Sequence, residues 1–241
     1  VTWVTILNTT NTQAYNNLTT QTIYRALVQS GLCTSQYSSQ AVVSIDAQPV
    51  GGTLYSDATV CGGANGGTLT LVGHVGNISN WESSIDGGLT WGSIANTTYT
   101  ENYLNIVTST LYRVIVASGV CPMDTSNAIT ITVDAPSVGG LVTMDDTVCA
   151  GANGAVLSLA GQTGNVTGWE YSQDGGVTWL NVANTSTSQG YTNLNTTTMY
   201  RVRVANGVCP STTSDTATIT VDPAVIAGTV SGNATVCATA N

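Results

Sequence analysis

Hydrophobic and polar residues alternate in short segments along most of the chain. The clearest segments in one stretch lie at residues 68–73, 80–85, 89–95, 111–117 and 128–133. Alternation with a period of two puts one face of a β-strand in a core and the other in solvent, and clusters of turn-forming residues separate these segments. No stretch shows the 3.6-residue period of an amphipathic helix, so the pattern predicts an all-β protein.

The same pattern returns after 88 residues without an insertion. Residues 51–138 and 139–226 are identical at 46 of 88 positions. The period exceeds the roughly 40 to 50 residues of a propeller blade, and a unit of this size can bury a core of its own. We therefore expect tandem immunoglobulin-like β-sandwich repeats of 88 residues, with seven strands in Greek-key order, forming an extended beads-on-a-string array.

The boundaries of the repeats follow from alternating segments that run into Pro and Gly. This pattern divides the chain into the C-terminal part of a truncated repeat at residues 1–47, complete repeats at 48–135 and 136–223, and the start of a further repeat at 224–241. We interpret the chain as part of a longer tandem array.

One motif occurs in both complete repeats, as SIDGGLTW and SQDGGVTW. An Asp-Gly-Gly sequence between two alternating strands predicts a hairpin, because glycine adopts positive φ and the Asp side chain accepts hydrogen bonds from the turn. The motif resembles the Asp-box of sialidase-type propellers and other β-folds, where it is a structural turn. The residues assigned to this turn are Ser84, Asp86, Gly88, Trp91, Ser172, Asp174, Gly176 and Trp179.

Composition excludes several classes of function. Four Arg and no Lys against thirteen acidic residues give a net charge of -9, which disfavours nucleic acid as a partner. No apolar run approaches the roughly 20 residues of a membrane span. The single His74 is replaced by Gln162 in the next repeat, so no catalytic triad or His-ligated metal recurs, and we expect no enzyme activity, no metal and no cofactor.

Two carboxylates per repeat, Glu82 with Asp86 and Glu170 with Asp174, could in principle act together as in glycosidases. A structural role explains the Glu of each pair better. Trp81 and Tyr112 are expected to face the core from neighbouring strands, which turns Glu82 and Arg113 outward. We predict cross-strand ion pairs between Glu82 and Arg113, and between Glu170 and Arg201.

Six cysteines repeat at the same spacing without any CxxC pair, which favours disulfides in an oxidising compartment over zinc. They are Cys33, Cys61, Cys121, Cys149, Cys209 and Cys237. The simplest pairing lies within a repeat, Cys61 with Cys121 and Cys149 with Cys209. In an immunoglobulin-like order, however, the two turns that carry the cysteines of one repeat lie at opposite ends of the sandwich, whereas a disulfide needs Cα atoms within about 7 Å. A bond across the junction, Cys61 with Cys209, is therefore the alternative.

The ordered set VCxGxNGxxLxLxG, WExSxDGGxTW, TxYRVxVxxGVCP and ITVD covers essentially the whole repeat. It resembles the immunoglobulin-like repeats of giant bacterial cell-surface adhesins of gliding bacteria that use type IX secretion. The resemblance implies a structural stalk or filament segment of a large secreted adhesin, located outside the cell at the bacterial surface. Its partners are then the neighbouring repeats of the same chain, with lateral pairing to other copies possible at exposed strand edges.

Two other functions remain open. A multivalent glycan-binding module would gain from avidity and needs exposed aromatic residues at equivalent positions, for which Tyr103 and Tyr191 are the candidates. An accessory domain of a secreted glycosidase rests on the Asp-box alone.

Overall fold

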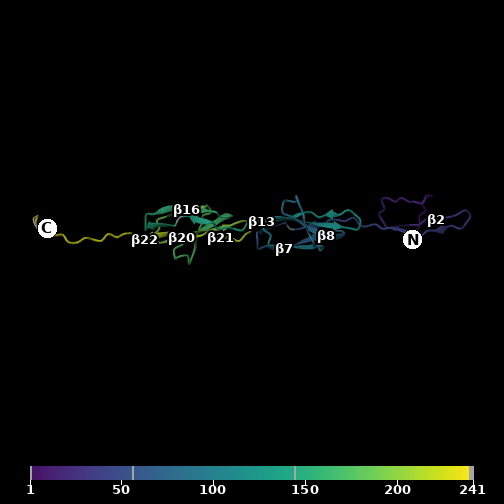
Figure 1. The fold of residues 1–241 in the computed structure, drawn as a ribbon. Coiled ribbons are helices and arrows are strands. Elements are labelled where there is room, and N and C mark those ends of the chain that lie inside the picture. The colour runs from purple at the N-terminus through teal and green to yellow at the C-terminus, as the bar shows by residue number, and fades with distance from the viewer. Residues whose placement is uncertain (1, 56, 144, 239–241) are drawn as a thin grey trace.

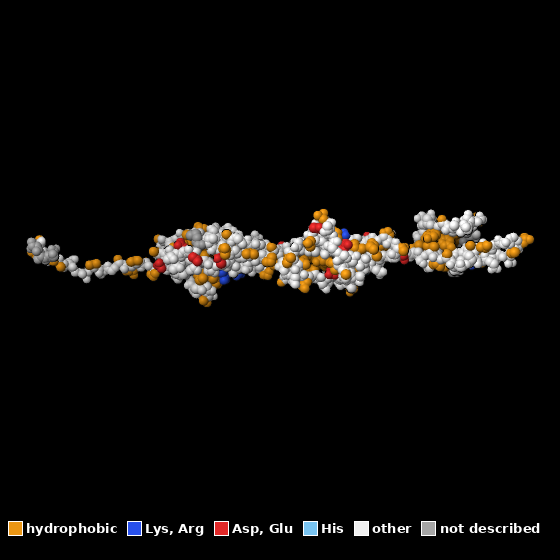
Figure 2. All heavy atoms as spheres, viewed as in Figure 1, with side chains coloured by type: hydrophobic (Ala, Val, Ile, Leu, Met, Phe, Trp, Pro, Cys, Tyr) orange, Lys and Arg blue, Asp and Glu red, His pale blue; other side chains and the backbone are white. Residues whose placement is uncertain are grey.

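The computed structural model describes residues 2–55, 57–143 and 145–238, and every regular element in these residues is a β-strand. Figure 1 shows a single row: a thin N-terminal segment, two sandwiches that lie end to end, and a C-terminal tail. Few charged side chains lie on the face shown in Figure 2, as the composition requires. The predicted fold class, an array of tandem sandwiches, is confirmed.

The first sandwich contains two sheets. One has the strand order β10-β7-β5, and the other has the order β6-β13-β11-β8-β9, with β12 paired to β11. The strands are β5 (Thr53–Leu54), β6 (Ala58–Cys61), β7 (Gly66–Val72), β8 (Asn77–Ser84), β9 (Gly92–Ile94), β10 (Thr100–Leu104), β11 (Thr110–Ala117), β12 (Asp124–Thr125) and β13 (Ile129–Asp134). The chain crosses repeatedly between the two sheets, as in an immunoglobulin-like sandwich, and β8–β9 and β11–β13 are the consecutive strands that stay in one sheet.

The second sandwich repeats this topology. Its sheets have the orders β14-β16-β19 and β15-β22-β20-β17-β18, with β21 paired to β20. The strands are β14 (Leu141–Thr143), β15 (Asp146–Cys149), β16 (Gly154–Ala160), β17 (Asn165–Ser172), β18 (Leu180–Val182), β19 (Ser188–Thr192), β20 (Thr198–Ala205), β21 (Thr212–Thr213) and β22 (Ala217–Asp222).

The core of each sandwich lies between its two sheets and is built by the predicted alternation. Along β11, every second side chain is buried, and Val114 and Val116 are fully enclosed. Trp81 on β8 is 0% exposed, and its indole Nε1 donates a hydrogen bond of 2.8 Å to the carbonyl oxygen of Thr98. The partner satisfies the buried N–H, so the ring adds its full apolar area to the core.

A short strand that the alternation did not reveal decides where the first cysteine of each repeat lies. β6 pairs in parallel with β13, and the register puts Cys61 opposite Asp134. In the second sandwich, β15 pairs in the same way with β22, so Cys149 lies opposite Asp222. Each of these cysteines is therefore at the C-terminal end of its own sandwich.

The two ends of the chain contain less regular structure. The N-terminal segment has two small hairpin pairings, β1 (Thr22–Tyr24) with β4 (Ala41–Val43) and β2 (Leu27–Val28) with β3 (Gln36–Tyr37). Among the described residues of the tail, 223–238, there is no strand. In the parts of the chain that the structure describes, no helix is long and apolar enough to cross a membrane.

Candidate functional site

The junction between the two sandwiches is closed by a disulfide. Cys61, at the end of β6 in the first sandwich, bonds to Cys209, in the turn after β20 of the second, with a Cα–Cα distance of 4.8 Å. The pairing of Cys61 with Cys121 and of Cys149 with Cys209, the simplest one from sequence, is therefore wrong. Its error is topological, because each repeat carries its two cysteines at opposite ends.

The loop that follows Cys61 is held in place by hydrogen bonds from one side chain. The side-chain amide of Asn65 donates hydrogen bonds of 2.7 Å to the carbonyl oxygens of both Cys61 and Ile106, and its oxygen accepts one from the Ile106 amide. One Asn thus ties the loop after β6 to the loop after β10. The same loop is bound in the second repeat, where Asn153 donates to the carbonyl oxygens of Cys149 and Leu194 at 2.8 Å.

A carboxylate next to the disulfide holds the turn that carries Cys209. Asp134 Oδ2 accepts a hydrogen bond of 3.0 Å from the Val208 amide. Gly207 has a φ of +49°, and a Cβ built on it would lie 1.9 Å from that carboxylate oxygen. Only glycine fits, because any side chain would both strain the left-handed backbone and displace Asp134.

Two further hydrogen bonds beside this carboxylate join the turn to the linker between the sandwiches. The Asn206 amide donates to Ser137 Oγ at 2.9 Å, and its side-chain Nδ2 donates to the Ala135 carbonyl oxygen at 2.7 Å. Each such bond contributes on the order of 1 kcal/mol, and a bond to a charged acceptor about twice that. The junction is therefore a specific interface as well as a covalent link.

The preceding junction has the same carboxylate contact. Asp46 Oδ2 accepts a hydrogen bond of 3.0 Å from the Val120 amide, and Gly119 repeats the φ of +49° and the 1.9 Å approach of a built Cβ. Asp46, Asp134 and the turn Gly-Val-Cys share the 88-residue period. That periodicity was visible in the sequence, but nothing there indicated that an Asp and a turn from adjacent repeats would meet.

The residues predicted to form cross-strand ion pairs lie together in the structure. Arg113 Nε is 2.6 Å from Glu82 Oε2, and Arg201 Nε is 2.7 Å from Glu170 Oε2. Each arginine also stacks on the Trp of the neighbouring hairpin, with its guanidinium carbon about 4 Å from the ring centroid. The stacked pairs are Arg113 with Trp91, Arg201 with Trp179 and, in the N-terminal segment, Arg25 with Trp3.

The hairpin motif forms a closed hydrogen-bonded turn in both sandwiches. In the second, Ser172 Oγ donates to Asp174 and accepts from the Gly176 amide, and Thr178 donates to Asp174 from both its amide and its hydroxyl. These donors, above all Thr178, lower the pKa of Asp174 to about 2. The equivalent contacts, led by Thr90, also hold the pKa of Asp86 well below its usual value. Because these carboxylates are ionised and already hydrogen-bonded within their own turns, they are poor candidates for a general acid.

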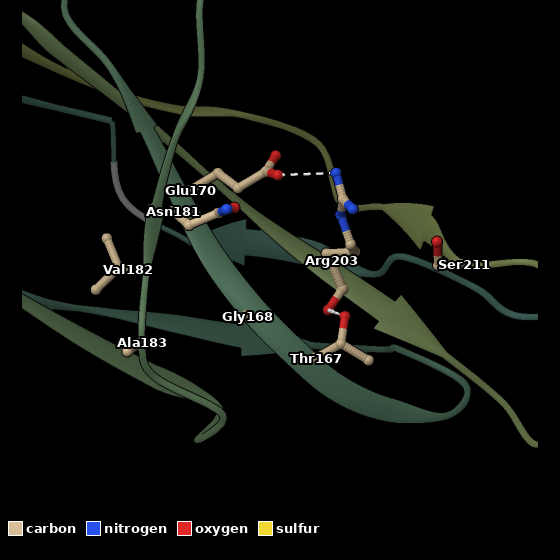
Figure 3. Close-up of a pocket in the computed structure, with 8 residues that line it drawn as sticks. All are labelled: Thr167, Gly168, Glu170, Asn181, Val182, Ala183, Arg203 and Ser211. Carbon is tan, nitrogen blue, oxygen red and sulfur yellow. Dashed lines mark hydrogen bonds and ion pairs between the residues drawn. The ribbon is translucent and has the colours of Figure 1, made fainter.

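An open depression of about 530 Å³ lies on the second sandwich. Figure 3 shows that the side chains of Glu170 and Arg203, which line it, point toward each other. Arg203 Nη2 lies 2.9 Å from Glu170 Oε1, so Glu170, whose side chain is 5% exposed, pairs with two arginines. Ile115 replaces Arg203 in the first sandwich, and six of the eight positions that line the depression differ between the repeats. The depression is therefore not a feature that the array repeats.

Comparisons with known proteins place the chain in a family. The model of a family described as a domain of unknown function, DUF8696, matches residues 1–47, 50–135 and 138–223. The chain belongs to the DUF8696 family. A comparison with curated proteins found no match.

Among solved structures, the DUF8696 repeats are similar to arrays of immunoglobulin and fibronectin modules. The N-terminal four Ig domains of Dscam1 isoform 6.9 match with 13% identity and a TM-score of 0.41, over 78% of this chain and 51% of that one. The FN1–FN3 domains of chicken CNTN1 match with 13% identity and a TM-score of 0.36, over 73% and 66%. The fibronectin(III)-like modules of Clostridium thermocellum CbhA match with 12% identity and a TM-score of 0.33, over 74% and 96%. The chain thus spans about half the length of the Dscam1 fragment.

Two aromatic residues that the glycan hypothesis required are not on the surface of the DUF8696 repeats. Tyr103 is 9% exposed and Tyr191 is 4% exposed, and each packs against the Tyr of the adjacent core position, Tyr112 or Tyr200. The expectation that they are exposed is wrong, because alternation along β10 and β19 turns both rings inward. Among the described residues, no group of three or more His, Cys, Asp or Glu side chains is placed to hold a metal ion.

Proposed function

We propose that this chain is a segment of the structural stalk or filament of a large secreted bacterial surface adhesin. Its role in this proposal is to bear tension and not to catalyse a reaction. The observation that carries the proposal is the junction, where a disulfide and a seated turn fix one sandwich to the next, and two further hydrogen bonds hold that turn to the linker between them. Tandem domains without such contacts move relative to each other by default. Specific contacts at the junction therefore indicate that the relative orientation of the two sandwiches is important for the function.

Several properties of the chain support this role. The two sandwiches have the same topology, and the observed disulfide joins one repeat to the next. The stability of such an array is the sum of the stabilities of its repeats and of the interfaces between them. A disulfide persists in an oxidising compartment, which supports an extracellular location. The carboxylates of the repeated motifs form ion pairs or stabilise their own turns, so we assign them no catalytic role.

The proposal is tested by the width of a distance distribution. Spin labels introduced as non-cysteine amino acids at the exposed equivalent positions Ser93 and Asn181 report the separation of the sandwiches by pulsed electron paramagnetic resonance. We expect one narrow distribution for the oxidised chain and a broad one for Cys61→Ser. Cys121→Ser is the matched control, because this cysteine forms no disulfide in the structure and its loss should leave the distribution narrow.

A broad distribution in the oxidised wild-type chain would contradict a stiff stalk. The cellular part of the proposal has its own test, which is labelling of intact cells with an antibody against the sandwiches. If antibody binding requires lysis of the cells, the surface location is wrong.

A further inference from the structure

The outward face of the second sandwich has a local surplus of positive charge in an acidic chain. Glu170, whose side chain is 5% exposed, pairs with both Arg201 and Arg203, so one negative charge faces two positive ones. The chain has only four Arg and no Lys, and its net charge is -9. Half of its basic side chains therefore meet at one carboxylate.

The guanidinium of Arg203 has more donors than Glu170 uses. Its Nη2 donates to Glu170 Oε1 at 2.9 Å, and the Arg203 side chain is 50% exposed. A guanidinium carries five N–H donors in a planar fork, which fits a carboxylate through two parallel hydrogen bonds. Among the described residues, Glu170 is the only acceptor of this guanidinium. Arg203 can therefore hold a second carboxylate, supplied by a ligand.

A glycine opens the space beside this guanidinium. In the register of β17 and β20, Gly168 lies opposite Arg203, whereas Asn80 lies opposite Ile115 in the first sandwich. The Asn80 side chain donates a hydrogen bond of 3.0 Å to the Trp81 carbonyl oxygen. Gly168 has no side chain at this position, and the depression of about 530 Å³ lies there. Its volume is in the range of about 300 to 1,000 Å³ that is typical of small-molecule sites.

Neutral polar groups line the same depression. In Figure 3, Arg203 lies between Asn181 and Ser211, and both of these side chains are exposed. An amide and a hydroxyl can each donate and accept hydrogen bonds, as the hydroxyl groups of a sugar do. The groups in the depression therefore suit a molecule with one carboxylate and several hydroxyls.

We propose that this depression binds an acidic sugar, whose carboxylate is held by Arg203 and whose hydroxyls are held by Asn181 and Ser211. The inference goes beyond the stalk function and does not depend on it. The first sandwich has Ile115 and Met123 at the positions of Arg203 and Ser211. Because it lacks both the guanidinium and the hydroxyl, we expect no binding there.

The test titrates the full oxidised chain with oligogalacturonate and follows the arginine side-chain Nε–Hε signals and the backbone amides by NMR. We expect saturable shifts for Arg203 and for the amides of Gly168 and Asn181, and none for Arg25 or Arg113. The fully methyl-esterified oligosaccharide has no charge but the same sugar rings. It should bind roughly tenfold more weakly, because the charge-assisted hydrogen bonds are lost.

The repeats supply matched variants for this test. Arg203→Ile introduces the residue of the first sandwich, which folds with the same topology, and should lower the affinity roughly tenfold or more. Arg25→Ile removes an equal charge far along the chain and should leave the affinity unchanged. The converse variant combines Asn80→Gly, Ile115→Arg and Met123→Ser, and should show saturable shifts in the first sandwich as well.

The absence of a saturable shift at Arg203, or equal affinities for Arg203→Ile and the wild-type chain, would overturn the site. Equal binding of the methyl ester would overturn the role of the carboxylate. If inorganic sulfate or polyglutamate shifts the same signals at the same concentration, the assignment to a sugar is wrong. A converse variant that keeps its other amide signals but shows no new shifts would contradict the roles given to these positions. None of these results alters the disulfide of the junction, so the stalk proposal is judged by its own measurement.

Discussion

Tension applied to the two ends of the chain should bypass most of its residues. The cysteines of the junction bond are 148 positions apart, so 147 residues lie between them, and these include strands β7 to β20. Force enters through the segment before Cys61, crosses the disulfide and leaves through the segment after Cys209. The enclosed residues cannot lengthen the molecule even when their hydrogen bonds break.

The size of the effect follows from the length of an extended chain. At about 3.3 to 3.6 Å per residue, the 147 residues between the two cysteines correspond to about 500 Å of contour length, which the disulfide excludes from the extension. The remaining 94 of 241 residues extend to about 320 Å, whereas the complete chain extends to about 830 Å. This difference is far larger than the resolution of single-molecule force spectroscopy.

The assay pulls the chain by handles at its termini, with and without a reductant. We expect the final contour length to increase by about 500 Å on reduction. Cys61→Ser should show the long extension without any reductant, and Cys33→Ser should keep the short one. Equal contour lengths for the oxidised and reduced wild-type chains would refute the bypass, and with it the assignment of the junction bond.

Three further predictions concern single side chains. Gly207→Ala should expose the junction turn to hydrogen exchange because its methyl group meets a carboxylate, whereas Gly31→Ala, with a similar φ and open space, should cost only about 1 kcal/mol of backbone strain. Glu170→Ala should lower the free energy of unfolding by about 2 kcal/mol against about 1 kcal/mol for Glu82→Ala, measured by urea titration, because Glu170 is more buried and pairs with two arginines. The pKa of Asp174 is depressed to about 2, so its turn should keep its amide signals above pH 4 and lose them as the pH falls toward 2, as followed by NMR; loss already near pH 5 would contradict this.

Alternation and periodicity in the sequence were enough to predict the sandwiches. Side chains such as Trp81 and Val114 lie where a period of two places them, and this also puts Glu82 opposite Arg113 in the register of β8 and β11. Local patterns succeed here because each strand buries one face against a core within its own repeat. The stacking of Arg113 on Trp91 was not foreseen, since it depends on how the hairpin folds back over the sheet.

The pairing of the cysteines could not be read from their spacing. The loop-entropy model gives about 4 kcal/mol for a 60-residue loop and about 5 kcal/mol for a 148-residue loop, a difference too small to choose between them. The choice depends on β6, a four-residue strand that joins its sheet in parallel and carries Cys61 to the end next to the following sandwich. Parallel pairing at a sheet edge leaves little signal in so short a segment.

The observed pairing has a mechanical consequence that pairing within a repeat would lack. Bonds from Cys61 to Cys121 and from Cys149 to Cys209 would leave the linker at residues 135–138 as the only covalent connection between the sandwiches. The bond from Cys61 to Cys209 instead encloses that linker, so the disulfide and the linker connect the sandwiches in parallel. Tension then loads the sulfur–sulfur bond first, and the carboxylate contact of Asp134 and the hydrogen bonds of Asn206 keep the junction aligned without bearing the load. A junction built in this way resists extension through its covalent bond, whatever the area of the contact around it.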